Sequence, residues 1–201
     1  MPLPKEYGNQ GCSLARSLEI LGERWTLLIV RDAFYGVRRF SDFAEHLGIP
    51  RSVLAARLDG LVASQVLAKA SSGDRGYAEY ELTDRGRQLW PVIYGLICWG
   101  DENLAADGPP RLFEHARDGG RVKPDGVCSA CGEHVPAPDF QAVPGPGLRP
   151  LSDPDPVTAA LSQPHRLLDD IRRPSASHPN QSQRKIPALQ AFARQLGERV
   201  P

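Results

Sequence analysis

The chain has 201 residues, and its 24 Lys and Arg residues are balanced by 24 Asp and Glu residues, so its formal net charge is zero. This balance does not favour nucleic-acid binding, but it does not exclude it, because a local basic surface is sufficient. No apolar run is long enough to span a membrane, and the N-terminus lacks the apolar core of a signal peptide. We therefore expect a cytoplasmic protein whose four cysteines are reduced.

The prolines are distributed unevenly along the chain. Residues 1–107 contain four of the 19, and residues 108–201 contain the other 15. Because proline interrupts helices, the first stretch favours a packed helical domain and the second does not. We expect a helical domain over residues 1–107, a small appended subdomain or extended segment over 108–150, and a flexible tail with short helices over 151–201.

Four helices are expected in the first third of the chain. Apolar residues at helical spacing predict helices over about 12–21 and 24–35, each ended by a glycine. Ser41 suits the N-cap of a third helix over 42–47. After a tight turn, Pro50 suits the first position of a fourth helix, whose leucines recur at helical spacing.

A β-hairpin and a long helix are expected next. Two extended runs, 66–69 and 77–82, flank a polar tip that contains glycine, which is typical of a hairpin. Thr83 suits the cap of a last helix that reaches about residue 104, and Pro91 is expected to kink it. This order predicts a mainly α fold: a winged helix-turn-helix domain with a small β-hairpin wing, plus a Pro/Gly-rich C-terminal extension.

The pattern in the second half of the chain is weaker. It allows one helix over 157–171, interrupted by Pro164, and a terminal amphipathic helix over 188–199. Residues 172–185 are rich in Ser, Asn and Gln, and we expect them to be disordered.

Several separated motifs resemble one known family. Cys12 and the run Leu18-Glu-Ile-Leu-Gly-Glu-Arg-Trp25 are followed in order by Arg39-Phe40-Ser-Asp-Phe43, Leu54-Ala-Ala-Arg57-Leu58, Tyr80-Glu-Leu82-Thr83-Asp-Arg-Gly86 and Trp99-Gly100. In this order and spacing they resemble the HxlR-type winged helix-turn-helix transcriptional regulators over about residues 11–101. The resemblance implies a homodimer, formed through the first and last helices, that binds a two-fold related site on double-stranded DNA.

The expected recognition helix offers few side chains to DNA bases. Its leucines face the core, and only the first two turns of such a helix normally reach base edges. Base readout should therefore be thin, with phosphate contacts and DNA shape contributing more. The candidate DNA-binding residues on this helix, on the wing and before the third helix are Arg38, Arg51, Ser52, Ala55, Ala56, Arg57, Lys69, Arg75 and Tyr77.

Three of the arginines have a structural alternative. The stem of Arg57 can lie along the core with its head in solvent, which we favour slightly over a base contact. We expect Arg38 to contact phosphate, and Arg39 to pair with Asp32 or Asp42 within the fold.

The expected last helix is apolar on more than one face. A helix packed on a single core needs one apolar stripe, so the surplus must be buried elsewhere. A symmetric partner is the simplest place. The candidate dimer-interface residues are Leu14, Leu18, Leu89, Ile93, Leu96 and Ile97.

Two cysteines are candidate sensors. Cys12 lies at the start of the first helix, where backbone N–H groups favour a thiolate. The resemblance implies that this position can sense oxidants or electrophiles. Cys98 on the last helix is a second candidate, although free cysteines are commonly small buried apolar residues.

A CxxC pair in the second half of the chain invites a zinc interpretation. Cys128 and Cys131, with His115 upstream and His134 downstream, supply four candidate ligands. The spacing to His134 is tighter than usual, and the chain has no second CxxC. The alternative is a small subdomain without any cofactor, in which this segment is a β-turn.

The hypothesis that follows is a homodimeric, sequence-specific DNA-binding transcriptional regulator that responds to an unknown effector or to redox state through Cys12. The alternative is a winged-helix protein–protein interaction module without DNA binding, with which the thin readout face and the zero net charge are compatible. We expect no enzyme and assign no catalytic residue, because the five histidines fall in no catalytic motif and no phosphate loop or nucleophile elbow is present.

Overall fold

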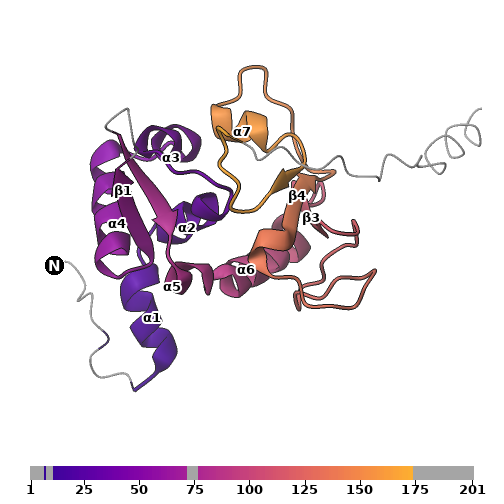
Figure 1. Ribbon diagram of the computed structural model, residues 1–201, viewed down its shortest axis with the longest axis horizontal. Coiled ribbons are helices and arrows are strands. Elements are labelled where there is room, and N and C mark those ends of the chain that lie inside the picture. Colours follow the sequence, from indigo (N-terminus) through magenta and orange to yellow (C-terminus); the bar gives the residue numbers. More distant parts are fainter. Residues whose placement is uncertain (1–6, 8–10, 72–76, 174–201) are drawn as a thin grey trace, which may run out of the picture.

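The computed structural model describes residues 7, 11–71 and 77–173. A helical half, formed by the first part of the chain, lies beside a second half that is built around a small sheet (Figure 1). Among the described residues, no helix is long and apolar enough to cross a membrane. The expected terminal helix over 188–199 and the tip of the expected hairpin lie outside the described residues.

Four helices form the first half, close to the expected positions. They are α1 Ser13–Leu21, α2 Thr26–Phe34, α3 Phe40–Leu47 and α4 Arg51–Ala63. Helix α3 begins before the expected cap, because the Arg39 carbonyl already accepts the backbone N–H groups of Asp42 and Phe43. The prediction of Ser41 as the cap is therefore wrong, and its hydroxyl donates to the Asp42 carboxylate instead.

The expected hairpin is present and follows α4 directly. Strands β1 Leu67–Ser71 and β2 Ala78–Leu82 pair antiparallel, with Leu67 opposite Leu82. Alternation along β2 buries Tyr80 and Leu82 against the helices and turns Glu79 and Glu81 away from the core. A third segment lies along this strand, because the Tyr80 backbone N–H donates to the carbonyl of Arg38 at 2.8 Å.

The predicted last helix consists of two helices, α5 Asp84–Arg87 and α6 Trp90–Leu104. Thr83 caps the first of them as expected, since its hydroxyl oxygen accepts the Gly86 N–H at 3.0 Å. Pro91 has no N–H to continue a helix, and its ring would clash with the carbonyl one turn before it. The chain therefore breaks before α6 rather than kinking within it, and Pro91 lies in the first turn of the new helix.

The C-terminal extension folds around one antiparallel sheet. Its strands, in the order β3-β4-β5, are β3 Arg111–His115, β4 Phe140–Pro144 and β5 His165–Arg166. A 3-10 turn, η2 Ala137–Asp139, leads into β4, and a short helix, α7 Pro156–Ala160, precedes β5. The sheet thus joins the expected subdomain over 108–150 to the expected tail over 151–201, because β5 belongs to the second of these segments.

Residues 155–173 pack on the helical half, in contrast to the flexible tail expected there. The Leu168 and Ile171 N–H groups donate to the carbonyls of Phe34 and Gly36, at 2.7 and 3.1 Å. Gly36 has a φ of +81°, and a Cβ there would lie 1.6 Å from the Asp169 carbonyl oxygen. Only glycine permits this close approach of the two backbones. Residues 155–173 are therefore an integral part of the fold.

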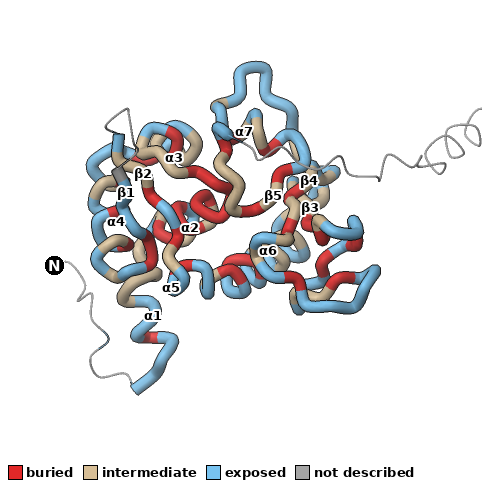
Figure 2. Tube along the Cα trace, viewed as in Figure 1, coloured by how far each residue is buried: buried red, intermediate tan, exposed pale blue. Residues whose placement is uncertain are grey.

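An aromatic cluster joins the two halves of the molecule. The Trp90 ring of α6 lies 5.0 Å from Phe34 of α2 and 5.2 Å from Phe140 of β4, between ring centroids. Tyr94 and Phe113 complete the cluster, with their centroids 5.3 Å apart. These edge-on and tilted contacts are typical of stable aromatic packing. Buried residues run continuously from the helical half to the sheet, as Figure 2 shows in red.

Candidate nucleic-acid interface and cysteine sites

Helix α4 turns one face to the core and the other to solvent. Leu54, Leu58 and Leu61 are buried, whereas Arg51, Ser52 and Ala56 are exposed, and Ala55 and Arg57 are partly covered. The turn between α3 and α4 contains Gly48 in the left-handed region, at a φ of +59°. This geometry leaves the first turn of α4 protruding with two polar side chains, as a recognition helix requires.

The side chain of Arg51 is held over an aromatic ring. Its guanidinium carbon lies 5.5 Å from the ring centroid of Phe40, the first residue of α3. A cation over a ring is attracted to the electron-rich face while its N–H groups stay available for other partners. Arg51 can therefore bind an anion or a base edge while its guanidinium stays over the Phe40 ring.

The hairpin next to α4 presents further polar groups. Lys69 is exposed, with its amine 5.8 Å from the Tyr80 ring centroid, and Tyr77 is 67% exposed. Arg75, the third candidate on this wing, lies outside the described residues. The described part of the wing thus offers one lysine and one tyrosine to a bound molecule.

Two of the predicted DNA-binding arginines are engaged within the fold. Arg38 donates to the Glu81 carboxylate of β2 at 2.5 Å, so a phosphate would have to compete with this ion pair. Arg57 donates to the Glu23 carboxylate at 2.7 Å and to the Arg24 carbonyl at 3.3 Å. These contacts favour the structural alternative for Arg57, because they tie α4 to the α1–α2 connection.

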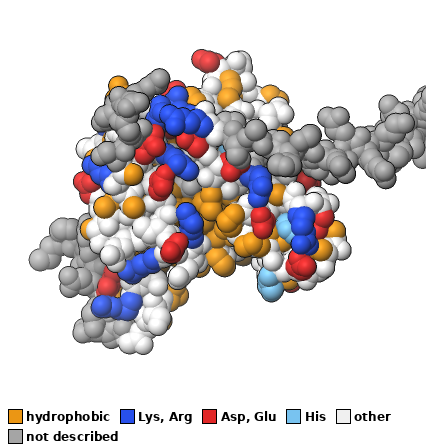
Figure 3. Space-filling view, viewed as in Figure 1, with side chains coloured by type: hydrophobic (Ala, Val, Ile, Leu, Met, Phe, Trp, Pro, Cys, Tyr) orange, Lys and Arg blue, Asp and Glu red, His pale blue; other side chains and the backbone are white. Residues whose placement is uncertain are grey.

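Arg39 pairs within the fold, but not with either expected partner. It lies 3.6 Å from Glu79 of β2, whereas Asp32 pairs with Arg31 at 2.7 Å and Asp42 with Arg172 at 2.6 Å. The alternation of Glu79 and Glu81 on the predicted hairpin could have indicated both Glu partners. Basic and acidic side chains are accordingly intermixed over this half of the molecule (Figure 3).

Apolar side chains are exposed on α1 and α6. Leu14 and Leu18 are 66% and 38% exposed, and Leu96 is 50% exposed. Val92 and Trp99 are 52% and 58% exposed and lie on the same stripe of α6 as Leu96. Figure 3 shows hydrophobic side chains gathered in the area where Figure 1 places α6.

Three candidate interface residues lie on the inner side of that helix. Ile93 is only 4% exposed and belongs to the chain's own core, so it is not part of an exposed face. Leu89 and Ile97 are partly buried against the same core. Helical spacing explains the correction, since positions 89, 93 and 97 lie on one side of α6 and 92, 96 and 99 on another.

The two sensing candidates differ in exposure and acidity. Cys12 is exposed at the start of α1, where hydrogen bonds from the backbone N–H groups of Ala15 and Leu14 lower the pKa of its thiol. Cys98 is partly buried on α6, and burial raises the pKa of its thiol. A thiolate is the reactive form, so Cys12 is the more reactive of the two at neutral pH.

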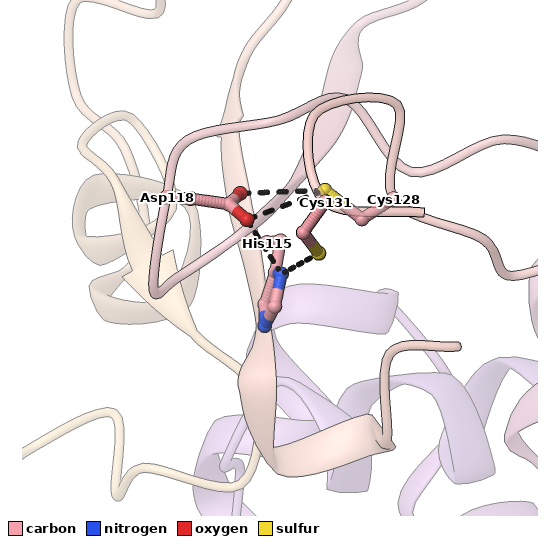
Figure 4. A group of neighbouring side chains, drawn as sticks. All are labelled: His115, Asp118, Cys128 and Cys131. Carbon is pink, nitrogen blue, oxygen red and sulfur yellow. Dashed lines mark hydrogen bonds and ion pairs between the residues drawn. The ribbon is translucent and has the colours of Figure 1, made fainter. Parts of the chain in front are cut away.

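The CxxC segment comes together with two residues near the end of β3. His115 and Cys128 are buried, and the ligand atoms of His115, Asp118, Cys128 and Cys131 all lie within 4.8 Å of one another. Figure 4 shows these four side chains converging. His134 is not in the group, so the predicted ligand set is corrected by replacing His134 with Asp118. The turn that follows β3 aims this carboxylate at Cys128, which spacing alone does not show.

A cavity of about 350 Å³ separates α6 from the loops beside the CxxC segment. Burial there raises the pKa of the Tyr94 hydroxyl, which donates to the Val122 carbonyl at 2.7 Å. The cavity combines apolar walls with charged groups and is lined in part by Tyr94, Cys98, Asp101, Arg111, Phe113 and Arg121.

These features together define a winged helix-turn-helix protein: α3, a tight turn and α4, followed by the hairpin and a long apolar helix. The chain belongs to the HxlR-like helix-turn-helix family, whose pattern matches residues 20–107. It is 44% identical over 142 residues to the HTH-type transcriptional regulator Mb3122 of Mycobacterium bovis. This alignment covers 70% of this chain and 90% of the relative.

Two further similar proteins are also named as transcription regulators or transcription factors. The HTH-type transcriptional regulator YvaP of Bacillus subtilis is 31% identical over 93 residues, covering 43% of this chain and 82% of the relative. The crystal structure of PA1607, named as a candidate transcription factor, is 34% identical and covers 71% of this chain and 96% of that one, with a TM-score of 0.53. The chain is thus a helix-turn-helix transcriptional regulator and not an enzyme.

Proposed function

We propose that two copies of this chain bind a two-fold related DNA site, with the first turn of α4 in the major groove and the hairpin wing on the flanking backbone. The observation that carries this proposal is the exposed pair Arg51 and Ser52 at the protruding N-terminus of α4. Recognition helices present base contacts from this end. Arginine can bind guanine through two hydrogen bonds, and the Ala56 methyl group can contact thymine.

Phosphate contacts supplement this short reading face. Lys69 and Tyr77 on the wing are exposed and can reach the DNA backbone, whereas the charges of Arg38 and Arg57 are partly cancelled by glutamates. A small number of phosphate contacts makes affinity less salt-dependent than in strongly basic proteins. Recognition therefore depends on two copies of the reading head acting together and on the shape of the DNA.

The exposed apolar face supports the dimer. Leu14 and Leu18 on α1 and the stripe of Val92, Leu96 and Trp99 on α6 leave large side chains in water. Monomeric proteins rarely leave large apolar patches uncovered, and a symmetric partner would bury the same residues on both copies. Tryptophan and leucine burial is the main source of affinity in such an interface.

A fluorescence anisotropy titration against the DNA flanking the protein's own gene tests the proposal. We expect binding that weakens with added salt, and a double variant Arg51→Glu/Lys69→Glu that binds at least about 30-fold more weakly, since such contacts are worth about 1–3 kcal/mol each. The matched control, Lys123→Glu/Arg149→Glu, makes the same charge change on exposed residues of the sheet half.

The control separates local contacts from bulk charge. Equal losses in both double variants would contradict the assignment of the surface to α4 and the wing. A folded wild-type dimer that binds no DNA at low salt would contradict DNA binding and favour the protein–protein interaction module instead.

A further inference from the structure

We propose that His115, Asp118, Cys128 and Cys131 hold a zinc ion in a tetrahedral structural site, with the Asp118 carboxylate as the fourth ligand. A structural zinc site is closed by four protein ligands, most often thiolates and imidazoles, and carboxylate oxygen is an accepted ligand. The inference concerns the second half of the chain and does not depend on the proposed DNA binding.

Three contacts among the four side chains have lengths close to those expected between ligands of one ion. The Cys131 Sγ lies 3.5 Å from His115 Nδ1, and the Cys128 Sγ lies 3.3 Å from an Asp118 oxygen. The other Asp118 oxygen lies 3.3 Å from His115 Nδ1. A tetrahedron with ordinary zinc–ligand distances separates its ligand atoms by about 3.3–3.8 Å. In Figure 4 the four side chains point at one another from β3, the turn after it and the CxxC turn.

The backbone around the cysteines is shaped to hold a thiolate. The Ala130 N–H points at Cys128 Sγ at 3.4 Å, and the Gly132 N–H donates to the Cys128 carbonyl at 3.0 Å, which closes the turn. Gly132 adopts a φ of +75°, which glycine tolerates and other residues rarely do. Backbone N–H groups aimed at sulfur are outer contacts that orient and stabilise a metal-bound thiolate.

Gly120 makes room for the cluster and supports its carboxylate. A Cβ at Gly120 would lie 2.4 Å from Cys128 Sγ, so a larger residue would displace the sulfur atom. The same residue donates its N–H to Asp118 at 2.9 Å, which fixes the carboxylate next to the thiol. One glycine thus positions two of the four ligands.

The charge balance also favours a divalent cation. Zinc binding displaces one proton from each cysteine thiol to solvent, and the ligand set then carries two thiolates and one carboxylate. Against the two positive charges of zinc this leaves one negative charge. The guanidinium of Arg117 hydrogen-bonds to Cys131 and, at 2.7 Å, to Glu133, and so supplies a neighbouring positive charge. Sulfur and imidazole ligands select zinc over magnesium or calcium, and the site has too few thiolates for an iron–sulfur cluster held by four cysteines.

The ion would stabilise the part of the protein that faces α6. It would close the loop from His115 to Cys131, which includes Val122, and the Val122 carbonyl accepts the Tyr94 hydroxyl of α6. Val122 and Val135 are buried, but this segment has few other apolar residues with which to form a core. Small segments of this kind commonly depend on a metal.

Metal analysis of the purified, untagged full chain tests the site. After dialysis we expect about one zinc ion per chain in the wild type, and less than about a tenth of that in Cys128→Ser/Cys131→Ser. Asp118→Asn should weaken zinc at least about tenfold in competition with a chromophoric chelator. The matched control is His134→Ala, in which zinc affinity should change less than about twofold because His134 is outside the cluster.

Cobalt substitution of the wild-type protein provides a readout that needs no variant. We expect the visible band of tetrahedral cobalt and the near-ultraviolet charge-transfer band of two thiolate ligands. The same spectrum from Cys12→Ser/Cys98→Ser would assign both thiolates to the CxxC pair. A wild type without bound zinc after reconstitution, an octahedral cobalt spectrum, or loss of zinc in His134→Ala with retention in Asp118→Asn would overturn the proposal.

Discussion

Arg51 and Lys69 each lie over an aromatic ring on the proposed DNA-binding surface, whereas Arg38 and Arg57 pair with glutamates. The difference matters because an arginine already paired with a carboxylate must exchange that partner for phosphate. A chain with zero net charge can therefore still present a binding surface, because Arg51 and Lys69 on that surface lie over aromatic rings.

The pKa values of the Cys12 and Cys98 thiols should be shifted in opposite directions from the ordinary value. Cys12 has its pKa lowered by backbone hydrogen bonds from an ordinary value of 9.0, and Cys98 has its pKa raised by burial from the same value. Because the thiolate reacts, alkylation of Cys12 by iodoacetamide should reach half its maximal rate below pH 9 and exceed that of Cys98 at pH 7.5. Peptide mass spectrometry across pH measures both rates, and equal rates at neutral pH would contradict the assignment.

Arg172 should contribute measurably to folding stability. Its guanidinium donates twice to Asp42, at 2.7 and 2.6 Å, and Asp42 is only 1% exposed. Arg172→Ala would leave this carboxylate, among the described side chains that donate to it, with the Ser41 hydroxyl, at a cost of about 1–2 kcal/mol, since the arginine itself is partly solvated. Urea denaturation measures the loss, with the neighbouring exposed Arg173→Ala as control, and equal midpoints for the two variants would refute the role.

Helix α6 combines two functions on two faces. Its inner face, with Trp90, Ile93 and Tyr94, forms the core that joins the two halves, and its outer stripe is exposed and forms part of the proposed dimer interface. A helix with apolar residues on both sides is stable only when both are buried. In the proposed dimer, the face of α4 that carries Arg51 would therefore be positioned by a scaffold that extends into the second copy.

Leu96→Glu should dissociate the dimer. The change places a charge in the apolar interface, where it has no partner, and should weaken self-association at least about tenfold. Light scattering of the wild type should give about twice the 22.0 kDa chain mass, and the variant should approach one chain mass at micromolar concentration. Leu151→Glu makes the same change at a site that is 60% exposed on the sheet half, and should remain dimeric. A wild-type monomer would contradict the interface.

At the scale of the whole molecule, local patterns predicted local elements well. The helices, the hairpin and the Thr83 cap depend on spacing within a few residues, and the sequence contains that spacing. The contacts of residues 155–173 with the helical half were not predictable in this way, because Arg172 meets a residue 130 positions earlier in the chain. Such pairings depend on the assembled core and leave no periodic signal.

The same difference between local and long-range contacts decides which parts of the candidate sites could be predicted from the sequence. The face of α4 followed from helical spacing, and so did the existence of a surplus apolar face on α6. The partners of Arg38 and Arg39 and the fourth residue of the cysteine cluster depend on how strands and turns are joined in space. Asp118 is recognised only when the turn after β3 brings it to Cys128, at 3.3 Å.

The central claim is that a dimer reads a two-fold related DNA site with α4, and hydroxyl-radical footprinting of the DNA flanking its own gene tests it most directly. We expect two protected half-sites with centres about 34–36 Å apart, or a multiple of that distance, on one face of the duplex. Protection should fade in parallel at both half-sites as salt is raised or when Leu96→Glu replaces the wild type. Uniform cleavage along the DNA in the presence of folded, dimeric protein at low salt would contradict the claim.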